Sequence, residues 1–110
     1  MGRLIEKIAR IYDALPLLDI VVPEWENEKI YYKPVTGEQY DVANNLLDEK
    51  ATGPRRNAQL IVSTALNAQG ARVFSDEDID VLMSKGFVET TGRLARAISA
   101  VTPSAVAEGN

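Results

Sequence analysis

The sequence predicts a single-domain α+β fold that is mainly helical, with about five helices and one small β-hairpin near residues 18–33. Two observations support this prediction. Apolar residues recur at helical spacing in five segments, which end near proline or glycine. One intervening stretch is instead rich in valine, isoleucine and tyrosine, which favour strands. A length of 110 residues suits one domain. We expect it to span residues 1–103, followed by a flexible tail at residues 104–110.

The first predicted helix runs from Arg3 to Leu15. Its apolar side chains share one face at helical spacing, and its charged side chains take the other face. Pro16 ends the helix, because a proline inside it would remove a hydrogen bond and clash with the preceding turn. The apolar face consists of Leu4, Ile8, Ile11 and Leu15, with Ile5 and Tyr12 beside them.

The hairpin follows directly. β-Branched residues up to Val22 favour a first strand, which Pro23 limits because proline cannot donate to a strand ladder. Residues 24–28 form a polar turn that holds the only tryptophan, and Lys29 to Lys33 form the returning strand. An isolated hairpin is only marginally stable in water. This one must therefore lie against the helices or pair with another chain.

The second and third helices have clear start signals. Thr36 and Gln39 form a capping-box pattern for a helix over residues 37–48, whose predicted buried stripe is Tyr40, Ala43, Leu46 and Leu47. Pro54 suits the first turn of the next helix. That helix is predicted over residues 55–68, and Gly70 closes it as a left-handed cap. Its apolar stripe is Ala58, Ile61, Val62, Ala65 and Leu66.

The fourth and fifth helices follow an extended link at residues 71–74. Ser75 is the expected N-cap of the fourth, whose acidic first turn suits the helix dipole. Its inner face is Ile79, Leu82 and Met83, and Gly86 ends it. The fifth helix is predicted from about Phe87 to Val101, before Pro103. Its apolar side carries Phe87, Thr91, Leu94, Ala95, Ile98 and Val101.

Composition argues against several classes of function. The net charge of −4 disfavours nucleic-acid binding, which needs a basic surface. Arg55, Arg56 and Arg72 could form a small basic patch, but a solvated helix start is the better interpretation. The chain has no cysteine and no histidine, which removes the thiolate and imidazole groups that most often act as nucleophiles, bases and metal ligands. No apolar run approaches the roughly 20 residues of a membrane span.

The acidic run D-E-D-I-D at residues 76–80 has the opening of a calcium-binding loop. The glycine and glutamate that such a loop needs are replaced by Val81 and Phe87, so the pattern fails twice. Serine nucleophiles have no histidine base. Ser84 and Lys85 are adjacent and would not face each other on a helix. We therefore expect no metal, no cofactor and no enzymatic activity.

Four residues are candidates for protein binding or self-association: Trp25, Tyr31, Tyr32 and Leu60. Trp and Tyr are frequent interface anchors. The structural alternative is that Trp25 folds over the core and one tyrosine faces inward. Strand alternation places Tyr31 and Tyr32 on opposite faces, so the two side chains cannot both be buried against the same side of the hairpin. Leu60 lies off the apolar stripe of its helix.

The order of elements resembles the tail assembly chaperones of long-tailed bacteriophages, the lambdoid minor-tail-protein-G type found in siphoviruses. The resemblance spans about residues 19–101. It rests on V-P-E-W at residues 22–25, K-I-Y-Y-K-P-V-T-G-E-Q at residues 29–39, V-F-S-D-E-D-I-D-V-L-M at residues 73–83 and G-R-L-A-R-A-I at residues 92–98.

The resemblance implies a mostly helical, non-enzymatic protein of the host cell cytoplasm. Such chaperones coat the tape measure protein, help to recruit the major tail protein and leave before the virion is complete. They tend to self-associate. Many phages also make a longer form by a programmed frameshift, and Glu108-Gly109-Asn110 could be encoded by a slippery heptamer. No catalytic residues carry over.

Two other functions stay open on the sequence. One is a small structural connector that is retained in the virion. The other, from a different class, is an acidic regulatory module that binds another small protein.

Overall fold

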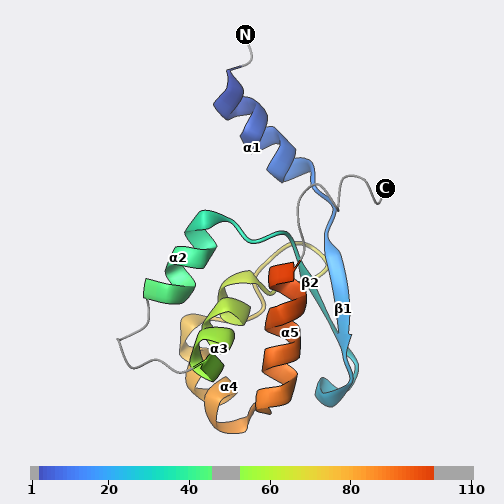
Figure 1. The fold of residues 1–110 in the computed structure, drawn as a ribbon. Helices are drawn as coiled ribbons and strands as arrows, with labels where there is room; N and C mark the ends of the chain where they lie inside the picture. The colour runs from blue at the N-terminus through green and yellow to red at the C-terminus, as the bar shows by residue number, and fades with distance from the viewer. Residues whose placement is uncertain (1–2, 46–52, 101–110) are drawn as a thin grey trace.

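The computed structural model describes residues 3–45 and 53–100, and within them the chain forms five α-helices and one two-stranded antiparallel hairpin (Figure 1). This confirms the predicted fold class. The predicted tail at residues 104–110, and the apolar positions Leu46, Leu47 and Val101, lie outside the described residues.

Helix α1 (Leu4–Ala14) stands clear of the other helices, at the end of the hairpin where the first strand begins (Figure 1). The hairpin pairs β1 (Leu18–Val22) with β2 (Glu28–Tyr32), from Leu18 opposite Tyr32 to Val22 opposite Glu28. A short 3₁₀ turn, η1 (Pro23–Trp25), begins its tip. Glu26 and Asn27 complete the tip with positive φ angles of 57° and 60°.

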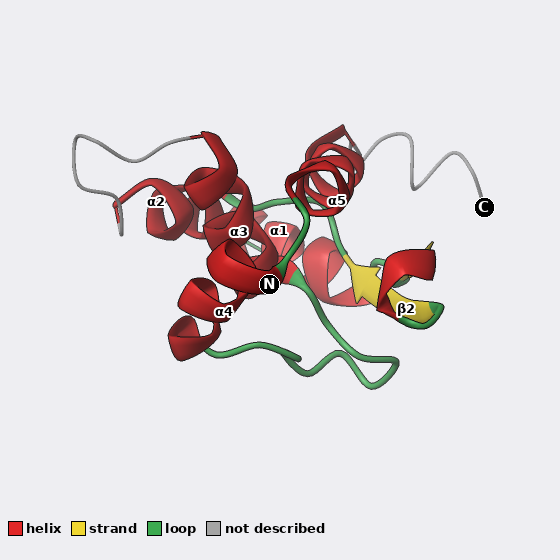
Figure 2. Ribbon diagram, turned by 90° about the horizontal axis from the view of Figure 1, so that it is seen from below, coloured by secondary structure: helices red, strands yellow, loops and turns green. Residues whose placement is uncertain are grey.

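The remaining helices pack together against one side of the hairpin. They are α2 (Gly37–Asn45), α3 (Gly53–Thr64), α4 (Ile79–Lys85) and α5 (Val88–Ala100), with the 3₁₀ turn η2 (Asp76–Asp78) leading into α4. Helix α3 contacts α2, α4 and α5 (Figure 2). Helix α5 also contacts β1. The core therefore lies around α3, and its most deeply buried apolar side chains include Val22, Ile61, Val62, Leu94 and Ile98.

The predicted end of the third helix was wrong. Helix α3 ends at Thr64 rather than Ala68, because the chain turns extended and pairs with the outer edge of β2. The Leu66 amide donates to the Tyr31 carbonyl at 2.7 Å, and the Tyr31 amide donates back to Leu66 at 2.9 Å. Gly70 does take the left-handed conformation, with φ of +84°, but it closes this turn rather than the helix.

Three residues predicted to face inward are exposed. Tyr40 of α2 is 62% exposed, Met83 of α4 is 37% exposed, and Phe87 before α5 is 66% exposed. The helical pattern selects an apolar face but does not say how completely each side chain on that face is covered. The prediction that these three side chains face inward was therefore wrong.

Candidate interaction surfaces

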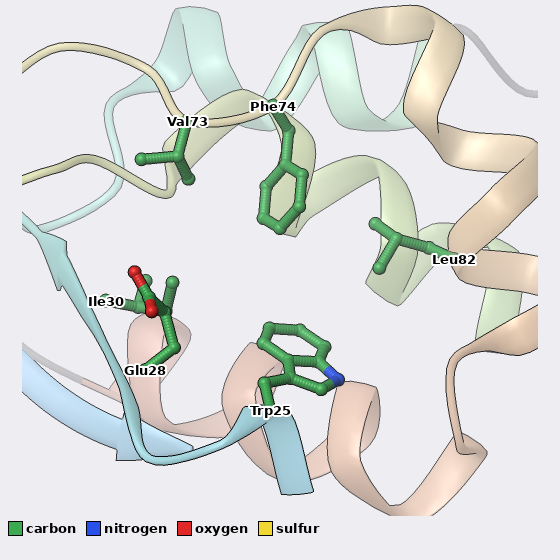
Figure 3. A pocket seen from close by; sticks show the side chains of 6 residues that line it. All are labelled: Trp25, Glu28, Ile30, Val73, Phe74 and Leu82. Atoms are coloured by element: carbon green, nitrogen blue, oxygen red, sulfur yellow. The ribbon is translucent and has the colours of Figure 1, made fainter.

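An apolar groove opens where the hairpin tip meets the link into α4. Its cavity measures about 350 Å³ and is lined by Trp25, Glu28, Ile30, Val73, Phe74 and Leu82 (Figure 3). Trp25 and Phe74 meet edge to face, with ring centroids 6.2 Å apart and planes at 74°. Two half-buried aromatic rings at the edge of the core offer anchors of the kind found in protein interfaces.

A network of charged side chains holds the hairpin tip, and with it Trp25, against α5. The Arg93 guanidinium lies 2.6 Å from one Glu24 carboxylate oxygen, and the Thr90 hydroxyl donates to the other at 3.0 Å. Glu89 pairs with the same guanidinium at 2.9 Å. Hydrogen bonds from Arg93 and the backbone lower the pKa of Glu24 to about 2. The carboxylate therefore stays ionised at any physiological pH.

A second apolar surface is the face of α1. Leu4, Ile5, Ile8 and Ile11 are exposed by 72%, 58%, 53% and 52%, and no residue of α1 is buried against the described part of the chain. The sequence predicted this face, but helical periodicity does not say what covers it. Four large aliphatic side chains in one stripe are more than the scattered surface apolar residues of an ordinary monomer.

The four predicted binding residues do not form one patch. Trp25 lines the groove, whereas the Tyr31 side chain is half-buried on the opposite face of the hairpin. The Tyr31 backbone pairs with Leu66 along the outer edge of β2. Tyr32 is 7% exposed, and this burial raises the pKa of its phenol. Leu60 packs half-buried against the core from α3. A role of these residues in binding stays a prediction.

Sequence reasoning missed Phe74 and Val73 as partners of Trp25. Both lie in the link that was predicted only as extended, 48 and 49 positions after Trp25 along the chain. No local spacing pattern connects residues so far apart, so only the packing of the link against the hairpin tip reveals the groove.

Asp76 and Asp78 of the acidic run, and Arg72 of the basic residues, have structural roles. Asp78 caps η2 by accepting from the Ser75 amide at 2.8 Å, and Asp76 pairs with Arg72 at 3.3 Å. Arg72 also donates to the Val62 carbonyl at 2.8 Å. Across residues 3–45 and 53–100, no three acidic side chains gather as they would around a metal ion.

The described helices are too short or too polar to cross a membrane. The contacts of Asp76, Asp78 and Arg72 organise the start of α4 and the surface around it. Among the described residues, the groove and the stripe on α1 are apolar surfaces that these charges do not explain.

No protein-family model and no curated protein matches the sequence. The fold is similar to a solved structure of the bacteriophage HK97 tail assembly chaperone, with a TM-score of 0.65 at 16% sequence identity. The match covers 93% of this chain and 96% of the other. At this identity the likeness shows the fold. It confirms that the resemblance seen in the sequence corresponds to the same arrangement of elements.

Proposed function

We propose that the protein is a phage tail assembly chaperone, which binds the tape measure protein in the host cytoplasm and helps to recruit the major tail protein. It would act without catalysis, self-associate and be absent from the mature virion. A longer, frameshifted form would contribute to recruitment of the major tail protein.

The observation that carries this proposal is the fold match to a tail assembly chaperone over nearly the whole of both chains. Agreement over 93% of one chain and 96% of the other involves the helices and the hairpin together, rather than one shared motif. The order of motifs in the sequence supports the same family independently of the coordinates.

The two apolar surfaces suit this role physically. A chaperone of this kind must cover apolar surface on a long helical client until assembly, and it can do so with many modest contacts rather than one deep site. The shallow groove at Trp25 and the stripe on α1 are surfaces of that kind. When weak contacts are repeated along one client, each contact that forms raises the effective concentration for the next one. The overall affinity then exceeds that of any single contact.

Co-expression with the tape measure protein of the same phage tests the proposal. We expect the tape measure protein to become soluble and to co-purify with this chain, and the chain to be missing from purified virions. Val73→Glu, which places a charge in the groove, should reduce co-purification. Val21→Glu adds the same charge to an exposed valine on the opposite face of the hairpin and should not. An insoluble tape measure protein would refute binding, and a fixed copy number in virions would indicate a connector.

A further inference from the structure

The hairpin has two outer edges, and the described part of the chain pairs with only one of them. On the β2 side, the Tyr31 amide donates to the Leu66 carbonyl at 2.9 Å, and the Leu66 amide donates back at 2.7 Å. On the β1 side, no described residue forms a strand bridge or a backbone hydrogen bond beyond the pairing with β2. Figure 1 shows β1 at the margin of the molecule, on the side away from α2.

The bonds between Tyr31 and Leu66 fix which backbone groups of β1 point outward. In an antiparallel pair, two facing residues either exchange both of their hydrogen bonds or direct both away from each other. Tyr31 directs its amide and its carbonyl away from β1. Asp19 faces Tyr31, so the amide and the carbonyl of Asp19 point out of the β1 edge. Val21, which faces Lys29, does the same, because the pattern repeats every two residues.

Prolines limit the length of this edge. Pro16 precedes β1, and Pro23 follows at the next position whose amide would point outward, where proline has no N–H to offer. The edge therefore presents the amides and carbonyls of Asp19 and Val21 to a segment of about 5 residues, the length of β1. Unpaired edge groups are a template for another strand, and strand addition is a common mode of peptide recognition.

The side chains of β1 define the chemistry of a matching strand. Asp19 is exposed, and none of the ion pairs among the described residues involves it. Val21 is 45% exposed on the same face. Between them, Ile20 points to the other face and packs half-buried against the core. A basic residue opposite Asp19 and apolar residues opposite Ile20 and Val21 would complement this row.

We propose that the β1 edge binds an extended segment of a partner protein, which joins the hairpin as a third, antiparallel strand. The segment reads Val-Ile-Lys or a similar apolar–apolar–basic sequence, with these residues opposite Val21, Ile20 and Asp19 in turn. A helix cannot take this place, because its amides and carbonyls are bonded within the helix. The edge is thus distinct from the groove and from the α1 stripe, and the inference goes beyond the proposed function.

Amide hydrogen exchange followed by NMR tests whether the edge is open in the full chain. The amides of Ile20 and Val22 point toward β2, so their protection factors should exceed those of Asp19 and Val21 by at least about 10-fold. Equal protection of all four amides would show that the edge is already covered, by its own chain or by a second copy. That result would overturn the proposal.

Binding is measured with a cyclic β-hairpin peptide whose exposed strand reads Thr-Val-Ile-Lys-Thr, and with a matched peptide that has glutamate in place of lysine. The lysine peptide should protect the amides of Asp19 and Val21 and bind at least about 3-fold more tightly than the glutamate peptide. Asp19→Lys should reverse this order, because it replaces the carboxylate with an ammonium group. Equal binding of the two peptides, or no new protection of the two amides, would overturn the proposal.

Val21→Pro tests the backbone contact separately from charge. It removes an amide that points out of the β1 edge, so the bonds between β1 and β2 remain, and proline is tolerated on edge strands. Binding of the lysine peptide should be lost.

Lys29→Pro is the matched control, because Lys29 faces Val21 and its amide points out of the opposite edge. This variant should bind the peptide like the unmodified protein, and circular dichroism checks that both variants are folded. Equal loss of binding in the two folded variants would refute the β1 edge as the site. The peptides replace the partner, so these results are independent of binding to the tape measure protein.

Discussion

Glu24 is the residue on which the position of the hairpin tip depends most directly. Its carboxylate receives hydrogen bonds from Arg93 and Thr90, which lie 69 and 66 positions further along the chain. These contacts join the turn that bears Trp25 to α5. No sequence pattern predicted them, because an ion pair between residues so far apart depends on how the elements pack.

Glu24→Gln should lower stability at neutral pH and flatten its dependence on acid. The pKa of Glu24 is about 2 in the folded protein, below its ordinary value of 4.5. The ionised carboxylate therefore stabilises the fold above pH 4.5, and this contribution disappears as the pH falls from 4.5 to 2. Urea midpoints of the two proteins should differ most near pH 6 and converge toward pH 2.

Asp41→Asn provides the matched control for this change. Asp41 is an exposed carboxylate in the middle of α2, so its removal should leave the urea midpoint at pH 6 nearly unchanged. Equal acid dependence in Glu24→Gln and the unmodified protein would show that the Arg93 contact does not contribute to stability.

At the scale of the elements, α1 and α3 show that equally regular apolar patterns can have opposite consequences. The α3 residues Ile61 and Val62 are 0% and 1% exposed, whereas the α1 residues Ile8 and Ile11 are more than half exposed. Burial of apolar surface is the main contribution to folding. Helix α3 therefore contributes to the stability of the monomer, and α1 contributes little to it.

Substitutions in these two helices should differ sharply in their effect on folding. Ile61→Ala removes a fully buried side chain and should cost about 2–5 kcal/mol. Ile8→Ser, at a concentration where the chain is monomeric, should change stability by less than about 0.5 kcal/mol. Urea denaturation followed by circular dichroism measures both. A large loss in Ile8→Ser would mean that the α1 stripe packs within its own chain.

At the scale of the whole molecule, the uneven distribution of charge has a consequence for assembly. The α1 helix with its cap carries three basic residues in a chain whose net charge is −4, while Glu28 lines the groove. Salt shortens the Debye length from about 10 Å at 0.1 M to about 3 Å at 1 M. It therefore screens charge attraction between copies but leaves apolar contact in place.

We expect the mean mass at a fixed protein concentration to fall as NaCl rises from about 0.1 to 1 M, without reaching that of the monomer. Lys7→Gln removes one basic side chain beside the stripe and should make this dependence weaker. Light scattering measures both. An assembly that grows with salt would show that charge opposes self-association.

Much of the fold was predictable because its signals are local. The capping box of α2 is present as expected, with the Thr36 amide donating to Gln39 at 3.0 Å and the Gln39 amide donating to Thr36 at 3.2 Å. Ser75 begins its turn in the same way. Pro16 and Gly86 follow the ends of α1 and α4. Each of these signals involves residues within four positions of one another, so no tertiary contact is needed to recognise them.

The sequence by itself determined the order of the elements, most of their boundaries and the apolar face of each helix. Only the tertiary structure decided which faces are covered, where α3 gives way to pairing with β2, and that Trp25 meets Phe74 in a groove. The physical reason is that periodicity expresses a preference for burial without specifying the partner. For α3 the partner lies in the same chain. For α1 none of the described elements covers the stripe.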